Sequence, residues 1–159
     1  MKVTLFFASV FLLAQLGMAQ SSKADEPYGK LKLLEGYKHK GGTTYDTLTG
    51  KIWKERGLEI WYESGLNEGY AADPRDKNKF NWFQEQDNGQ YKLFVGLTRT
   101  GEGSTWSPDR RRGGATSKIA IVTITGKFGP LDATNFYAEV LDEKELAELL
   151  LMVMTFKPY

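Results

Sequence analysis

The chain has 159 residues, of which 41% are hydrophobic and 26% are charged, and its formal net charge is +1. This length accommodates one compact domain with a sizeable core. A charge this close to zero argues against a nucleic-acid partner, because affinity for phosphate backbones comes from a surplus of Lys and Arg. The chain contains no cysteine, so its stability has to come from packing and thiol chemistry is excluded.

Residues 1–19 have the pattern of a secretory signal peptide. A basic residue precedes an apolar run, and the small residues Gly17 and Ala19 precede a cleavage site before Gln20. The apolar run is short for a bilayer-spanning helix, and an uncleaved anchor helix is the alternative. We therefore expect a secreted or periplasmic protein with no membrane span after cleavage. An exported domain without disulfides is typical of a bacterial source.

Residues 20–30 are polar and without periodicity, which predicts a flexible linker. The remaining residues, 31–159, are expected to form a single β-rich domain. Its first strand is predicted at Leu31–Tyr37, followed by a turn at Gly41–Gly42. The only histidine, His39, lies between two lysines before this turn and is interpreted as a solvated loop residue.

The run 43–65 is rich in threonine, aromatic and β-branched residues and predicts paired strands. Alternation from Leu58 to Glu63 gives one apolar face and one face on which Trp61 lies between two glutamates. Trp61 is therefore a candidate ligand-binding residue, for a sugar ring for example. In the alternative that we favour, Trp61 packs under a loop and the glutamates pair with bases of the neighbouring strand: Lys51, Lys54 or Arg56.

Residues 66–79 form a polar connection without a calcium-loop pattern, in which Tyr70–Ala72 is expected to pack against the body of the protein. The Asn88–Gly89 pair between two alternating runs predicts a β-hairpin closed by a type I′ turn.

The loop 99–115 is the most distinctive connection. It contains four glycines among polar residues, together with four candidate ligand-binding residues: Trp106, Arg110, Arg111 and Arg112. Long loops are often binding elements, and an arginine cluster can hold a phosphate, sulfate or carboxylate by bidentate hydrogen bonds. The alternative is a solvated run of charge.

The stretch 116–125 contains an apolar run on both faces and predicts a central strand that is covered on both sides. Residues 126–133 are expected to turn, with Pro130 outside the ladder, and residues 135–140 to form the last strand.

A C-terminal helix is predicted over 142–155. Asp142 with Glu145 has the form of a capping box at its start. A wide apolar stripe follows, which is expected to pack against the sheet: Leu146, Leu149, Leu150 and Val153, joined by Ala147, Leu151 and Met154.

These elements predict a mainly β, α+β fold. We expect a curved antiparallel sheet or small barrel of about eight short strands with one C-terminal helix packed on it. This layout resembles the architecture of the lipocalin-like barrels. The Gly-x-Trp motif of that family is absent, since Gly50-Lys51-Ile52-Trp53 has one residue more.

No nucleophile, base and orienting group are recognisable together, so no catalytic residue is predicted. One histidine and no cysteine remove the usual zinc sites, and no metal or cofactor is expected. The leading interpretation is an exported, soluble, non-enzymatic binding or interaction domain. Its partner would be a small molecule, a glycan or an acidic protein surface, and the sequence does not determine its oligomeric state.

Two alternatives stay open. One is a carboxylate-based hydrolase acting on glycans, with Glu59 and Glu63 or Asp46 as acid and base. Glu59 and Glu63 are four residues apart on one strand, which separates their Cα atoms by roughly 13 Å. This distance is too long for the carboxylate pair of a retaining glycosidase unless the two side chains lean together. The other is a structural or assembly protein of the cell envelope that uses exposed sheet edges.

Overall fold

The computed structural model describes residues 31–43, 47–65, 69–87, 89, 91–99, 117–126 and 129–157. The expected signal peptide and linker, 1–19 and 20–30, lie outside these ranges. The elements in chain order are β1 (Tyr37–Thr43), β2 (Thr47–Lys54), β3 (Glu59–Gly65), the 3-10 helix η1 (Pro74–Lys79), β4 (Trp82–Asp87), β5 (Lys92–Arg99), β6 (Lys118–Gly126), β7 (Gly129–Val140) and α2 (Glu143–Val153).

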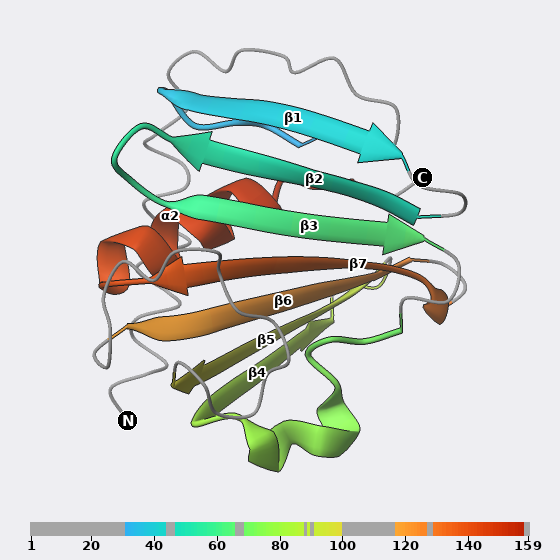
Figure 1. Ribbon diagram of the computed structural model, residues 1–159. Coiled ribbons are helices and arrows are strands. Elements are labelled where there is room, and N and C mark those ends of the chain that lie inside the picture. The colour runs from blue at the N-terminus through green and yellow to red at the C-terminus, as the bar shows by residue number, and fades with distance from the viewer. Residues whose placement is uncertain are drawn as a thin grey trace.

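All the strands belong to one seven-stranded antiparallel sheet with the order β1-β2-β3-β7-β6-β5-β4 (Figure 1). Within the described residues no ladder joins β1 to β4, so these strands are the two edges of an open sheet. The prediction of a mainly β fold with one C-terminal helix is confirmed. The barrel alternative, and with it the closed architecture of the lipocalin-like proteins, is wrong.

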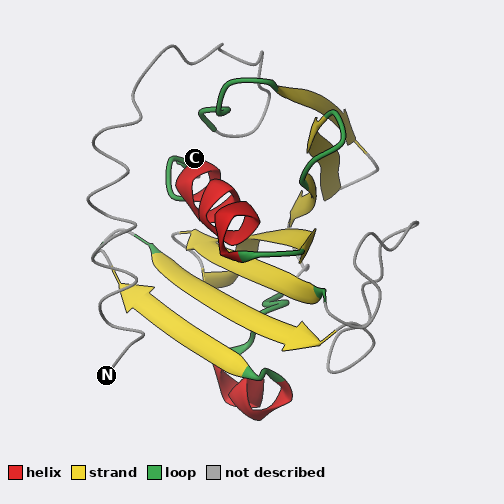
Figure 2. Ribbon diagram, turned by 90° about the vertical axis from the view of Figure 1, so that its left-hand side faces the viewer, coloured by secondary structure: helices red, strands yellow, loops and turns green. Residues whose placement is uncertain are grey.

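The sheet curves around α2, and η1 lies on the opposite face (Figure 2). We call the face that packs on α2 the inner face and the opposite one the outer face. The described residues form one buried cluster on each face. The larger cluster joins α2 to the inner face, and the smaller joins the segment 70–80 to the outer face of β4–β7.

Strand β6 lies between these two clusters. Ala120, Val122 and Ile124 belong to the inner cluster, whereas Ile119 and Ile121 belong to the outer one. All five are at most 3% exposed. The apolar character of both faces is therefore required by burial on both sides, and the prediction of a central strand is confirmed.

The C-terminal helix also follows the prediction. The Asp142 carboxylate accepts a hydrogen bond from the Glu145 amide (2.8 Å), and the Glu145 carboxylate accepts one from the Leu141 amide (2.9 Å). These bonds satisfy backbone donors near the helix start that lack intrahelical partners. The buried side chains are Leu149, Leu150, Met152 and Val153, so Met152 belongs to the core as well.

The prediction of a first strand at Leu31–Tyr37 is wrong except for Tyr37. Gly36, with φ of 81°, lies in a turn in which the Tyr37 amide donates to the Leu34 carbonyl (3.2 Å), and β1 starts only at Tyr37. The expected turn at Gly41–Gly42 is also wrong, because both glycines pair with β2. The polar lysine-containing run pairs as a strand because the neighbouring strand β2 supplies its hydrogen-bond partners.

Tyr62 explains why glycine occupies position 50 of the sheet. Its ring lies across Gly50, where a Cβ atom would be 2.2 Å from the Tyr62 hydroxyl. The hydroxyl reaches His39 on β1, 2.6 Å from Nε2, and the two rings stack with centroids 5.7 Å apart. His39 is thus a half-buried strand residue on the inner face, and its interpretation as a solvated loop residue is wrong.

The hairpin β4–β5 is confirmed, but its turn is longer than predicted. Asp87 pairs with Lys92, which leaves residues 88–91 between the strand ends instead of the two central residues of a type I′ turn. The Asp87 carboxylate accepts from the Gly89 amide (2.8 Å), and Gly89 has φ of 82°. Asp87 itself therefore stabilises the turn.

The last strand is longer than predicted, because β7 begins at Gly129. The turn expected over 126–133 is therefore wrong for residues 129–133, and Pro130 lies inside a strand. The β6–β7 register shifts between Ile124 and Gly126. Pro130 lies on the stretch of β7 opposite this irregularity, which is where a strand tolerates proline.

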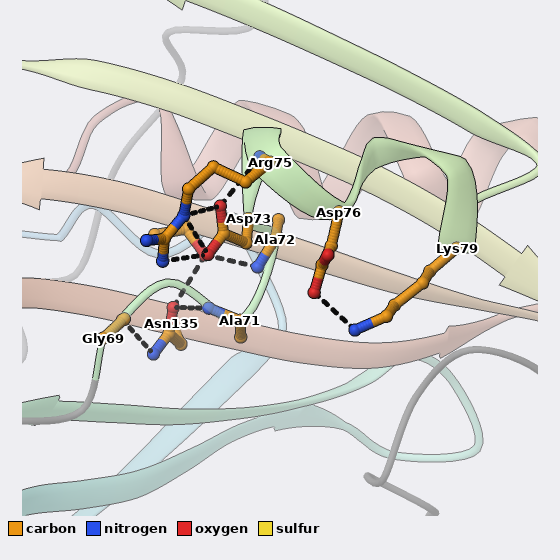
Figure 3. Close-up of polar contacts among 9 residues, drawn as sticks. Gly69, Ala71, Ala72, Asp73, Arg75, Asp76, Lys79 and Asn135 are labelled. Carbon is orange, nitrogen blue, oxygen red and sulfur yellow. Dashed lines mark hydrogen bonds and ion pairs between the residues drawn. The ribbon is translucent and has the colours of Figure 1, made fainter.

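A buried polar network holds the segment before η1 on the sheet (Figure 3). Asn135 Oδ1 accepts from the Ala71 amide (3.1 Å) and from the Thr123 hydroxyl (2.7 Å), while Asn135 Nδ2 donates to the Gly69 carbonyl (3.2 Å). Thr123 Oγ1 in turn accepts from the Ala72 amide (2.9 Å). Ala72 is fully buried, which confirms that Tyr70–Ala72 packs against the body of the protein.

The 3-10 helix η1 begins with an Asp73 cap. The Asp73 carboxylate accepts from the backbone amide and the guanidinium of Arg75, and these bonds lower the pKa of Asp73. Burial raises the pKa of the nearby Tyr70, whose ring packs against Phe94 with centroids 5.3 Å apart.

We predict that Asn135→Ala lowers the free energy of unfolding by about 2–4 kcal/mol, because buried backbone groups of the segment 69–71 lose their partner. Urea unfolding measures the loss, and hydrogen exchange at Ala71 should become faster. The control is Thr49→Ala, which removes an exposed hydroxyl. Equal stability losses in the two variants would contradict a structural role for the network.

We also predict that Asp73→Asn changes the pH dependence of stability. A lowered folded-state pKa stabilises the protein above the unfolded pKa, near 3.8, and this contribution is lost as the pH falls through the folded pKa. Asn keeps the cap but carries no charge, and Arg75 is largely exposed, so the effect at pH 6 should be below about 1 kcal/mol. Urea unfolding measures the free energy of unfolding of both proteins at pH 6 and pH 3. The difference between the variant and the parent should be smaller at pH 3. If the difference in free energy of unfolding were the same at both pH values, the lowered pKa of Asp73 would not contribute to stability.

Candidate functional site

The outer face of β1–β3 carries a regular arrangement of aromatic and charged residues. Residues that pair directly across antiparallel strands point to the same face. The registers give three rows: Lys38–Trp53–Glu59, Lys40–Lys51–Trp61 and Gly42–Thr49–Glu63. The two tryptophans are thus diagonal neighbours on β2 and β3.

An open groove of about 480 Å³ lies over these rows. We call it the tryptophan groove. It is lined by Lys40, Gly41, Gly42, Thr49, Gly50, Lys51, Trp53 and Trp61. A Cβ atom at Gly42 would meet no heavy atom closer than 3.9 Å, so the missing side chain at this position leaves open space. The volume of the tryptophan groove is in the range of sites that bind small ligands.

Lys51 is the centre of the interactions in this groove. Its ammonium is 2.6 Å from Glu59 Oε2 and 4.9 Å from the ring centroid of Trp61. Trp61 Nε1 donates to the other Glu59 oxygen at 2.8 Å. Both indoles are half-buried, and Trp53 is 6.0 Å from the same ammonium. The network fixes the position of the Trp61 indole.

The predicted pairing of Glu59 with Lys51 is confirmed by this contact. Lys54 lies on the inner face instead, with Nζ 3.8 Å from Glu148 on α2. The Tyr37 hydroxyl donates to the same Glu148 (2.5 Å), so this group ties the helix to β1 and β2.

Glu59 and Glu63 are both engaged by neighbouring donors. Glu63 accepts a hydrogen bond from the Tyr137 hydroxyl on β7, and Glu59 is held by Lys51 and Trp61. Neither carboxylate lines the tryptophan groove. The geometry therefore lends no support to this pair as acid and base of a hydrolase. Asp46, the other candidate, lies outside the described residues.

Two lysines of β1 differ from Lys51 in their surroundings. Lys38 and Lys40 are exposed, and none of the ion pairs found within the described ranges involves either residue. Lys40 also pairs directly across the ladder with Lys51. Like charges in directly opposed positions destabilise a sheet.

Of the ligand-binding residues predicted from sequence, Trp61 lies in the groove. Four others lie outside the described residues: Trp106, Arg110, Arg111 and Arg112. Sequence reasoning missed Trp53 and Lys40. Alternation alone relates Trp53 to Lys51, but only the registers of three strands bring Lys40 and both tryptophans together.

In the part of the chain that the structure describes, no three His, Asp or Glu side chains are grouped as metal ligands would be. No helix among the same residues is both long and apolar enough to cross a membrane.

Comparison with protein-family models, with curated proteins and with solved structures found no match for this chain. The functional argument therefore rests on the geometry of the site.

We predict a coupling free energy of about 0.5–1 kcal/mol between Lys51 and Glu59 in a double-mutant cycle with Lys51→Gln and Glu59→Gln. The pair is partly exposed, which limits its contribution, and the coupling should shrink at high salt. Urea unfolding of the four proteins measures it. The matched pair Lys79 and Asp76 on η1 tests a more exposed contact. A coupling of zero at low salt would show that the contact does not position Trp61.

Proposed function

We propose that the protein is an exported, non-enzymatic binding domain whose ligand docks in the tryptophan groove, and that the ligand is a glycan. The observation that carries the proposal is the pair of half-buried indoles beside an open groove on a sheet face. An indole offers a large flat surface with a negative face, on which the C–H groups of a sugar ring can pack.

The preorganisation of Trp61 supports this proposal. Its Nε1 is bonded to Glu59 and its ring is held by the Lys51 ammonium, so little side-chain freedom remains to be lost when a ligand binds. Export is supported by the signal-peptide pattern of residues 1–19. None of the described residues that line the groove carries a carboxylate, so they supply neither of the two acids that glycoside hydrolysis needs.

Tryptophan fluorescence tests the proposal directly. We predict that soluble oligosaccharides, titrated into the purified protein, change the emission in a saturable way. Trp61→Ala should weaken binding about tenfold or more, because buried aromatic contacts carry much of the energy of a site. Gly42→Leu should obstruct the groove, and a Cβ atom at Gly42 makes only ordinary contacts, at 3.9 Å or more.

Trp82→Phe is the matched control. Trp82 is a half-buried indole on β4 that packs on the inner cluster, away from the groove. Its replacement should leave the affinity unchanged, and circular dichroism verifies the fold of each variant. Binding that survives in both Trp61→Ala and Gly42→Leu would place the ligand elsewhere. No response to any glycan, neutral or acidic, would refute glycan binding.

A further inference from the structure

We propose that the tryptophan groove selects an acidic polysaccharide, and that Lys40 supplies the charge that distinguishes it from a neutral one. This inference rests on the proposed function and narrows its ligand class. The supporting observation is that the glutamates near the groove have hydrogen-bond or ion-pair partners, whereas Lys40 has no ion-pair partner among the described residues.

The two glutamates of the site already have partners within the protein. Glu59 accepts from Lys51 and from Trp61, and Glu63 accepts from the Tyr137 hydroxyl. Glu59 therefore offsets the charge of Lys51, with which it is in direct contact. Both carboxylates lie on β3, two strands away from β1.

The lysines of β1 have no comparable acidic partner among the described residues. Lys40 lines the groove, is exposed, and takes part in none of the ion pairs within the described ranges. Lys38 lies two residues away on the same face of β1, opposite Trp53. The groove therefore has indoles along β2 and β3, and along β1 two lysines that no described carboxylate neutralises.

The direct pairing of Lys40 with Lys51 adds a second reason. Two ammonium groups share this row with one contacting carboxylate, Glu59, which offsets only one of the two charges, so an anionic group that binds near Lys40 would reduce the remaining repulsion. A ligand with sugar rings and repeated carboxylates matches both parts of the groove, since its rings can pack on the indoles while a carboxylate reaches the lysines. The chemistry that the groove fits is thus a polyuronate.

Oligogalacturonate and its fully methyl-esterified form are a matched ligand pair, with the same rings but only one of them charged. At low salt we expect the acid to bind at least about fivefold more tightly than the ester. Lys40→Gln should weaken binding of the acid by about two- to fivefold, and Lys38→Gln/Lys40→Gln by about tenfold, without changing binding of the ester. Lys144→Gln, an exposed lysine on α2, is the control and should change neither.

The outcomes separate this inference from the proposed function. Equal binding of acid and ester by the parent protein would overturn the charge selection and leave the glycan groove standing, whereas binding of neither ligand would refute both. Binding of the acid that is unaffected by Lys40→Gln would overturn the role of Lys40. Binding to anionic phospholipid vesicles that exceeds binding to the acid and is lost in Lys40→Gln would show that the charge serves a lipid surface instead.

The free protein offers an independent readout. Lys40→Gln should raise the urea midpoint at low ionic strength, because it removes the repulsion from Lys51, and the gain should vanish at high salt. A lower midpoint would show that Lys40 has a stabilising partner, which would also overturn the inference.

Discussion

The fold depends on covering both faces of the central strands β6 and β7. One face is covered by an α-helix, which satisfies its own backbone hydrogen bonds. The other is covered by an irregular segment, 69–72, whose backbone groups would be costly to bury without partners. Asn135 and Thr123 supply these partners from the sheet itself. These two polar side chains, both fully buried on the central strands, therefore make the second layer possible.

The limited reach of this second layer explains where the candidate site lies. The segment 70–80 packs on the outer face of β4–β7, where Phe94, Ile119 and Ile121 are buried. On β1–β3 the outer face carries lysines, glutamates and tryptophans, which are exposed or only partly buried. The outer face of the sheet thus has a half that the segment 70–80 covers, β4–β7, and an open half that it does not cover, β1–β3. The groove lies on the open half.

Contacts on the inner face connect the strands of the open half to one another and to α2. Tyr62 spans from β3 across Gly50 to His39 on β1, and Tyr37 and Lys54 connect β1 and β2 to Glu148 on α2. These contacts lie directly beneath the groove, with Gly41 and Gly50 contributing backbone to both faces. A polar site can therefore stand on a thin, solvent-facing sheet because its reverse side is fixed by aromatic and ionic contacts.

Local patterns in the sequence determined the class of the fold and much of its core. Alternation in β3, the two-sided apolar run in β6 and the Asp142 cap of α2 each express a contact between near neighbours, so they can be read without the rest of the chain. The sequence also indicated Trp61 as a candidate binding residue, and Lys51 as one of three bases that could pair with the glutamates beside it. Tertiary structure alone decided that His39 and Gly41–Gly42 lie in a strand, because β2 provides the partners that a lysine- and glycine-rich run does not specify. It likewise decided that Trp53, Trp61 and Lys40 share one groove, since that proximity depends on the registers of three strands, which are set by hydrogen bonds between residues far apart in the chain.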